Sequence, residues 1–222
     1  RVIKGGSRQY VNKLVAGHRD RIRLNSPVES VRRIDDRVEI ISASGGREMF
    51  DHVFLACHSD QALALLKDAT VAEREVLGAI QYQSNEAVLH TDESLLPTRR
   101  RAWAAWNYHV PRDNGRHVAV TYHMNLLQGL QAGKQYCVTL NADQHINPDK
   151  IIRRVQYEHP IYSREAVAAQ QRHEEINCDR TFFCGAYWRN GFHEDGVVSA
   201  LNAVDHFEQR LADGQLHLRR AS

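Results

Sequence analysis

The sequence predicts a mixed α/β (α+β) fold, and three observations lead to this class. Short apolar runs typical of strands alternate with helical patterns along the whole chain. Residues 53–56 form a continuous apolar run, typical of a strand buried on both faces. The chain closes with a short strand at 181–184 and a long helix at about 196–212, whose apolar residues recur at helical spacing.

The first part of the chain is predicted to be rich in strands. A short helix at 7–16 follows the glycine pair Gly5-Gly6. Strands are expected at 21–24, 28–33, 38–42 and 52–56. The turn Ser44-Gly45-Gly46 separates residues 38–41 from Met49-Phe50, which predicts a β-hairpin.

Helices and then a mainly antiparallel sheet are predicted for the middle of the chain. Ser59 is expected to cap a helix to 67, and Thr70 with Glu73 forms a capping-box pattern that begins a second helix to about 79. Strands are expected at 87–90, 102–108, 117–124, 136–141 and 151–157, and Ser163 caps a helix to about 173. We therefore expect three blocks, residues 1–58, 59–177 and 178–222, with the first and last in one domain.

Composition argues against several classes of function. The formal net charge of the 222 residues is only +2, which gives no reason to expect a nucleic-acid partner. Arg99-Arg100-Arg101 with Trp103 and Trp106 is a weak exception, because alternating aromatic residues usually pack in a sheet. No run approaches the roughly 20 apolar residues of a membrane-spanning helix. The chain begins with Arg1 rather than Met, which predicts that it was cut from a longer protein.

The four cysteines are scattered and form no C-x-x-C pair. Reduced, buried thiols and a cytoplasmic location, or one peripheral to the membrane, are therefore expected. No metal site is predicted, because His193-Glu194 and His173-Glu174 lack the spacing of a helical zinc motif. Ser59 and Ser199 lack the sequence context of a hydrolase nucleophile.

The best candidate site lies where the strand at 181–184 leads through a loop into the last helix. The backbone amides of Gly196 and Val197 are expected at the helix start without intrahelical partners, an arrangement that suits an anion or an electron-rich ring. Gly185 and Gly196 would let a flat ligand approach the backbone. The alternative is an ordinary strand-to-helix connection in which Asp195 is the N-cap.

Several motifs in order along the chain resemble the flavin-containing amine oxidase superfamily, specifically a bacterial subgroup of amine-oxidase-like NAD/FAD-binding proteins. The resemblance rests on Gly5-Gly6-Ser7 with Leu14, on Pro27-Val28, on residues 51–57, on residues 182–185 and on Asp195-Gly196-Val197. It spans about 200 residues and corresponds to the C-terminal half of the family. It implies a partial FAD-binding domain formed by the two chain ends, with a substrate domain inserted between them.

The resemblance also implies roles for individual residues in binding FAD. Val28 would contact the adenine region, Ala56 would lie near the dinucleotide, and Gly185 with Ala186 would lie by the ribityl chain. Asp195, Gly196 and Val197 would form the helix start at the flavin N1–C2=O edge, where positive helix-end charge would favour an anion. Phe192 and His193 would face the flavin, and His193 is the candidate for orienting a substrate or moving a proton. A purely structural role for His193 stays open.

Departures from the family's pattern limit these expectations. Ala186 stands where the family has an acidic residue, and no lysine occurs at 88–92, where many amine oxidases carry one. No G-x-G-x-x-G is present, so stable FAD binding is expected to need an N-terminal segment outside this chain. The expected function is hydride removal from a C–H bond of a small organic or lipid-like substrate. Desaturation or isomerisation of a lipid or polyene, and a non-catalytic binding or assembly protein, remain alternatives.

Overall fold

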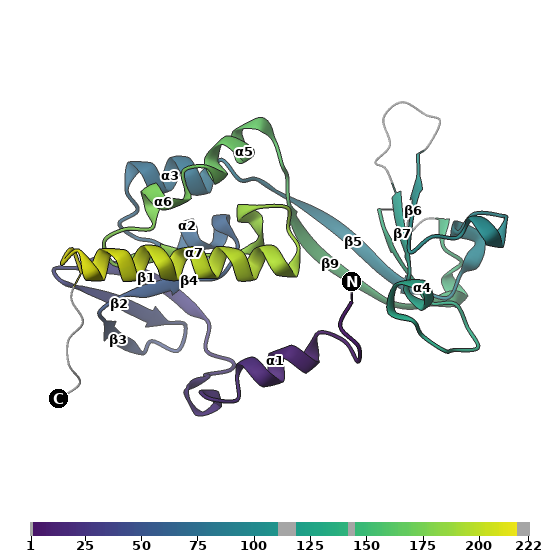
Figure 1. The fold of residues 1–222 in the computed structure, drawn as a ribbon, viewed down its shortest axis with the longest axis horizontal. Coiled ribbons are helices and arrows are strands. Elements are labelled where there is room, and N and C mark those ends of the chain that lie inside the picture. Colours follow the sequence, from purple (N-terminus) through teal and green to yellow (C-terminus); the bar gives the residue numbers. More distant parts are fainter. Residues whose placement is uncertain (1, 111–118, 142–144, 217–222) are drawn as a thin grey trace. The chain divides into compact units, whose positions relative to one another are not determined.

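The computed structural model describes residues 2–110, 119–141 and 145–216, which divide into two compact units. Unit 1 comprises Arg1–Ile22 and Ser84–His159, and unit 2 comprises Arg23–Gln83 and Pro160–Ser222. Helices and predominantly antiparallel sheets occur together (Figure 1), so the predicted α/β (α+β) class is confirmed.

Unit 2 contains an antiparallel sheet of three strands in the order β1-β2-β3. Its strands are β1 (Val28–Ile34), β2 (Arg37–Ser42) and β3 (Arg47–Phe50). The predicted hairpin is the β2–β3 pair, in which Val38 lies opposite Phe50. Gly45 has a φ of 82° in its turn, a conformation that glycine adopts without a steric penalty.

A second sheet in unit 2 joins the first and last parts of the chain. Strand β4 (Val53–Leu55) pairs in parallel with β10 (Thr181–Phe183), and Phe54 lies opposite Phe182. The apolar run of β4 was expected to be buried on both faces, but Phe54 is 39% exposed. Its ring stacks on Phe182, with ring centroids 4.9 Å apart. The backbone of β4 pairs with β10 along one edge, and no strand of the described residues pairs with its other edge.

Helices cover the sheets of unit 2. They are α2 (Ser59–Leu65), α3 (Val71–Gly78), α5 (Arg164–Gln170), α6 (His173–Ile176) and α7 (His193–Ala212). Two predicted caps are confirmed: Thr70 Oγ1 accepts the Glu73 amide at 3.1 Å, and Ser163 Oγ accepts the Ala166 amide at 3.1 Å. Ser59, by contrast, is the first residue of α2 and not its cap. Its buried hydroxyl donates to the Ile80 carbonyl instead.

Two apolar clusters hold unit 2 together. The larger one brings side chains of β1, β2, β4, α3 and β10 into contact, including Val31, Val38, Leu55, Leu77 and Phe183. The smaller one packs α7 against β10 through Phe182, Cys184, Ala203 and Leu216. Burial of about 25 cal/mol per Å² of apolar surface is the main stabilising term for such clusters.

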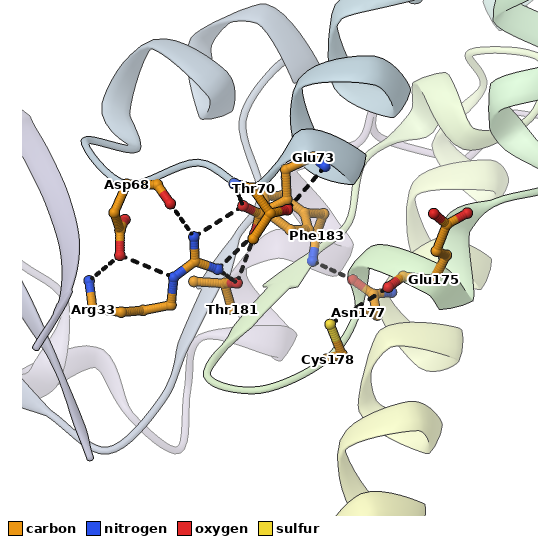
Figure 2. A network of polar contacts seen from close by, with 9 residues as sticks. All are labelled: Arg33, Asp68, Thr70, Glu73, Glu175, Asn177, Cys178, Thr181 and Phe183. Atoms are coloured by element: carbon orange, nitrogen blue, oxygen red, sulfur yellow. Dashed lines mark hydrogen bonds and ion pairs between the residues drawn. The ribbon is translucent and has the colours of Figure 1, made fainter. Parts of the chain in front are cut away.

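A buried ion pair links three elements of unit 2 that are distant in sequence (Figure 2). Arg33, on β1, donates to both carboxylate oxygens of Glu73 in α3, at 2.7 and 2.9 Å. The same guanidinium donates to Thr181 Oγ1 on β10 at 3.0 Å and to Asp68 Oδ2 at 3.1 Å. The Glu73 side chain is only 3% exposed, so this pair is shielded from solvent.

Unit 1 contains α1 (Arg8–Leu14) and most of a five-stranded sheet in the order β6-β7-β8-β5-β9. The strands are β5 (Tyr82–His90), β6 (Trp106–His109), β7 (Ala119–His123), β8 (Cys137–Leu140) and β9 (Ile151–Pro160). Neighbouring strands β6, β7, β8 and β5 are antiparallel, as predicted. Residues 117 and 118 of the expected strand 117–124 lie outside the described residues. A short helix α4 (Met124–Gln128), which was not predicted, follows β7.

The strand expected at 21–24 was wrong. Arg19–Arg21 form a 3₁₀ turn, and the following residues are not a strand. Leu24 is 81% exposed, and Asn25 has a φ of 54°, which interrupts an extended backbone. The two apolar residues of this segment, Ile22 and Leu24, have no neighbouring strand among the described residues. A strand there would leave its backbone groups unpaired.

The boundaries of the two compact units differ from the expected division at 58/59 and 177/178. Helices α2, α3, α5 and α6 belong to unit 2 because they pack against its core. The parallel pairing of β4 with β10 does bring residues 23–58 of the first block into one unit with the last block, whereas residues 1–22 belong to unit 1. Which unit binds a cofactor and which binds a substrate stays a prediction.

Candidate functional site

The candidate site lies at the carboxyl ends of β4 and β10. The parallel register continues past the last paired residues, since the Cys184 amide donates to the Leu55 carbonyl at 3.0 Å. Ala56 and Gly185 therefore follow two neighbouring strand ends at the same edge. This edge of a parallel sheet is where α/β proteins bind ligands.

Ser199 fixes the start of α7 at this edge. Its Oγ accepts the Gly185 amide at 2.9 Å and donates to the Gly196 carbonyl at 2.9 Å. Ser199 is 1% exposed, so both hydrogen bonds are shielded from water. The structure thus brings together Gly185 and Gly196, two of the residues that the sequence predicted, through a residue that it did not predict.

Asp195 holds the loop that precedes the site. Its Oδ2 accepts the backbone amides of Asn190 at 3.2 Å and Phe192 at 3.0 Å. The side chain of Asp195 is 9% exposed, and Arg189 Nε lies 3.8 Å from its Oδ1. Asp195 therefore stabilises the loop from within the first turn of the helix, with Phe192 as the N-cap.

The start of α7 corrects two expectations. The helix begins at His193, three residues before Gly196, because the Phe192 carbonyl accepts the amides of both Asp195 and Gly196. The amide of Gly196 is therefore not free, and Val197 is the fifth residue of the helix. The amides at the helix start belong to His193 and Glu194, the first two helical residues.

Gly185 is required by the ring of Tyr187. A Cβ on Gly185 would lie 2.3 Å from Tyr187 Cε1, far inside van der Waals contact. Tyr187 follows Ala186 in a 3₁₀ turn, Ala186–Trp188, and is only 3% exposed. Burial raises the pKa of the Tyr187 phenol, which therefore stays neutral.

The surroundings of Gly196 leave room for a flat group. A Cβ built on Gly196 would meet no atom within 4 Å, and the next residue, Val197, is 49% exposed. At the end of β4, His58 Nδ1 is buried and has no hydrogen-bond partner in the described part of the chain. The open space beside Gly196 and the helix N-terminus fit a planar group with negative or electron-rich character, such as a flavin.

Val28 and His193 are the less closely connected candidates. Val28 begins β1, in the other sheet of unit 2, and is 40% exposed. Among the described contacts, none joins Val28 to Gly185 or Gly196. His193 is exposed as the first residue of α7, close in sequence to Asp195.

Two further expectations concern lysine and cysteine. Strand β5 carries no lysine, but Lys150 approaches its end and forms a 3.0 Å ion pair with Asp92. All four cysteines are free, and burial raises the pKa of the Cys57 and Cys184 thiols beside the site. Across the described residues, no cluster of three or more His, Cys, Asp or Glu side chains has the arrangement of a metal site.

Two parallel strands that end beside a glycine and the start of a helix form an arrangement at which α/β proteins bind ligands. Residues 1–124, more than half of the chain, match the family described as flavin containing amine oxidoreductase. The chain belongs to this family, as the sequence motifs predicted. No curated protein sequence matches it. Within the described ranges, no helix has the length and apolar character needed to cross a membrane.

Solved structures share the fold at low sequence identity. Cyclohexylamine oxidase from Brevibacterium oxydans IH-35A has a TM-score of 0.62, with 11% identity over 92% of this chain and 53% of its own. Putrescine oxidase bound to putrescine has a TM-score of 0.59 and 11% identity over the same shares. A CLA-producing fatty acid isomerase from P. acnes has a TM-score of 0.55 and 17% identity, over 82% of this chain and 47% of its own. The chain thus spans about half the length of these proteins.

Proposed function

We propose that this chain is the C-terminal part of an FAD-dependent oxidoreductase that removes a hydride from a C–H bond of an organic substrate. The observation that carries the proposal is the Ser199 bridge, which places Gly185 and Gly196 at one edge of a parallel sheet. Membership in the flavin-containing family supports FAD as the ligand of this edge. Bound FAD would supply the hydride-accepting chemistry.

The residues at the edge have distinct proposed roles. Gly185 and Ala186 would line the ribityl chain, and Ala56 would lie near the dinucleotide. Gly196 would offer bare backbone to the ring, with Val197 beside it. Because the Gly196 amide is already paired, the positive potential at this edge comes from the first-turn amides of α7 as a group. Asp195 would hold the loop in place, and Val28 would contact the adenine region.

We further propose that a segment outside this sequence completes the FAD-binding domain. The chain spans about half the length of the similar solved structures. Val197, Leu201 and Val204 form an exposed apolar row along α7, at 49%, 58% and 39% exposure, and Phe54 is 39% exposed on β4. Exposed apolar rows of this kind are typical of surfaces that pack against another segment.

The proposal allows two classes of substrate, amines and lipids. Similar structures include oxidases named for putrescine and cyclohexylamine, which favours an amine. The absence of a lysine on β5 and the similarity to a fatty acid isomerase favour a lipid substrate and a desaturation or isomerisation. A binding or assembly protein without catalysis is the alternative from a different class.

Flavin content tests the proposal. The 222-residue chain alone should not retain FAD, because the phosphate-binding fingerprint is absent from it. The protein extended by the proposed N-terminal segment should carry stoichiometric FAD, measured by visible absorbance after purification. Stoichiometric FAD in the chain alone would contradict the need for a further segment. An extended protein that takes up no FAD would contradict the oxidoreductase and favour a binding protein.

A further inference from the structure

One face of the sheet in unit 1 is buried but polar. Thr121 on β7 lies opposite Thr139 on β8, and His90 on β5 is a diagonal neighbour of Thr139 on the same face. His90, Thr121 and Thr139 are 0%, 4% and 1% exposed. Burial of a polar group costs free energy unless the group is hydrogen-bonded, so each of these three side chains is expected to have a partner.

The donor of each hydrogen bond across this face can be assigned, beginning at His90. The Asp92 amide donates to His90 Nδ1 at 3.1 Å, so the proton of a neutral His90 lies on Nε2. His90 Nε2 then donates to Thr139 Oγ1 at 2.8 Å. The hydroxyl oxygens of Thr139 and Thr121 lie 2.9 Å apart, and we assign Thr139 as the donor because its hydrogen has no other acceptor among the described residues. Burial lowers the pKa of His90, which agrees with the neutral form.

The last hydroxyl of this row is left with a hydrogen to donate. Thr121 Oγ1 accepts from Thr139, and no acceptor for its own hydrogen is found among the described residues. Asn107, which lies opposite Thr121, does not provide one, because its side-chain oxygen accepts the Ala104 amide and its nitrogen donates to the Ala104 and Thr121 carbonyls.

Thr121 lies in the wall of a cavity of about 600 Å³ within unit 1. Leu95, Leu96 and Pro97 line one part of it, and Asn107, Tyr108 and Ala119 line another. Its size is that of small-molecule sites, and the described lining contains no Asp, Glu, Lys or Arg. The carboxylate of Asp92, two residues before Ser94 of the lining, already accepts hydrogen bonds from Lys150 Nζ and from the Asn147 amide.

We propose that this cavity binds a small molecule with an apolar body and a carbonyl-type oxygen, which accepts the hydrogen bond of Thr121. The apolar part of the wall would hold the body, and Thr121, whose oxygen is assigned to accept from Thr139, would donate its own hydrogen to the ligand. An ammonium group, which has only hydrogens to donate, would leave the Thr121 hydrogen without an acceptor, and the described wall offers it no carboxylate. The proposal rests on unit 1 alone and is independent of the flavin site.

The test uses the full-length protein in the flavin state in which it is purified, with octanamide, octanoate and octylammonium as probes in isothermal titration calorimetry. Octanamide or octanoate should bind at least tenfold more tightly than octylammonium, because only their oxygen accepts the Thr121 hydrogen, and one such hydrogen bond discriminates by about that factor. Octylammonium that binds as tightly as both others, or no binding of octanamide and octanoate, would overturn the proposal. Binding of only one of these two would identify whether a neutral or a charged oxygen is preferred, and supports it.

Three variants test the role of Thr121. Thr121→Val should weaken the binding of the preferred probe roughly tenfold, whereas Thr121→Ser, which keeps the hydroxyl, should bind it within about twofold. Thr98→Val is the matched control, because Thr98 lines the same cavity but is solvent-exposed and outside the row. An equal loss in Thr98→Val and Thr121→Val would contradict the assignment. If Thr121→Val does not fold, the probe preference of the unmodified protein still decides.

Discussion

Ser199 Oγ lies 2.9 Å from the amide nitrogen of Gly185 and accepts its hydrogen bond, although the two residues belong to different elements. The same hydroxyl donates to the Gly196 carbonyl, three residues before it in α7. A serine that bonds back along its own helix in this way is common. Here the second bond connects the helix to the end of β10, so the geometry of the candidate site depends on one hydroxyl.

Ser199→Ala should therefore destabilise the site. The Gly185 amide would lose its partner in a buried position, which costs about 1–3 kcal/mol of unfolding free energy. We expect this loss in denaturant unfolding, together with a lower FAD content in the extended protein. Ser7→Ala is the control, since Ser7 is exposed and makes no capping hydrogen bond with its side chain. Equal stability of the two variants would show that the Ser199 bridge contributes nothing.

The two glycines of the site should respond in opposite ways to alanine. Gly185→Ala would place a Cβ 2.3 Å from the Tyr187 ring, which must move, so we expect a loss of about 1–3 kcal/mol. Gly196→Ala meets no atom within 4 Å and lies in a helix, so a gain of about 0.5–1 kcal/mol is expected. Thermal unfolding of both variants measures the difference, and a shift of the same sign in both would contradict this account.

A larger side chain at Gly196 tests the placement of the cofactor. The space beside Gly196 is open in the described structure, so Gly196→Leu should leave the fold intact. In the extended protein we expect it to abolish FAD content, because the leucine would occupy the position proposed for the ring. Circular dichroism reports on the fold, and visible absorbance reports on the flavin. Normal flavin content in Gly196→Leu would show that the ring lies elsewhere.

Local signals in the sequence were enough to predict several elements. The hairpin around Gly45 and the caps at Thr70 and Ser163 depend on residues within four positions of each other, and these are confirmed. The start of α7 was placed three residues too late. Asp195 looked like an N-cap, but it accepts amides from within the first turn, an arrangement that the sequence does not distinguish from a cap.

Contacts between distant residues could not be predicted from the sequence. Arg33 and Glu73 are 40 positions apart, and they meet only because β1 and α3 pack in the same core. The His90–Thr139–Thr121 row depends on the register of three strands, so a shift of one residue would remove it. Ser199 was considered only as a nucleophile, because its bond to Gly185 depends on how α7 packs on β10.

The Arg33–Glu73 pair predicts a pH-dependent stability for unit 2. Burial alone would raise the pKa of Glu73, but the hydrogen bonds from Arg33 and Thr70 lower it below its ordinary value of 4.5. A carboxylate with a lowered pKa stabilises the fold above its unfolded pKa, and this stability is lost as the pH falls through the folded value. Unfolding free energy should therefore decline as the pH is lowered from about 4.5.

Glu73→Gln isolates this contribution. At neutral pH we expect a loss of about 3 kcal/mol, because one partner of a buried ion pair is removed. The variant should also lose less stability than the unmodified protein between neutral pH and pH below 4.5. Glu48→Gln is the control, since the Arg23–Glu48 pair is exposed and should contribute little. Denaturant titrations at several pH values measure both effects, and a similar loss in both variants would contradict the role of burial.

His193 is the last candidate, and its test concerns the chemistry of the proposed enzyme. As the first residue of α7, it is exposed and two positions before Asp195, next to the proposed flavin edge. If its imidazole orients a substrate or moves a proton, His193→Phe should keep normal FAD content in the extended protein. Anaerobic flavin reduction by an accepted amine or fatty acid should then be slower by roughly 100-fold. In the control variant His18→Phe, whose substitution is at an exposed position in unit 1, the flavin should be reduced at the normal rate. An unchanged rate in His193→Phe with intact flavin would assign His193 to the structure of the loop, and a loss of flavin would assign it to cofactor binding.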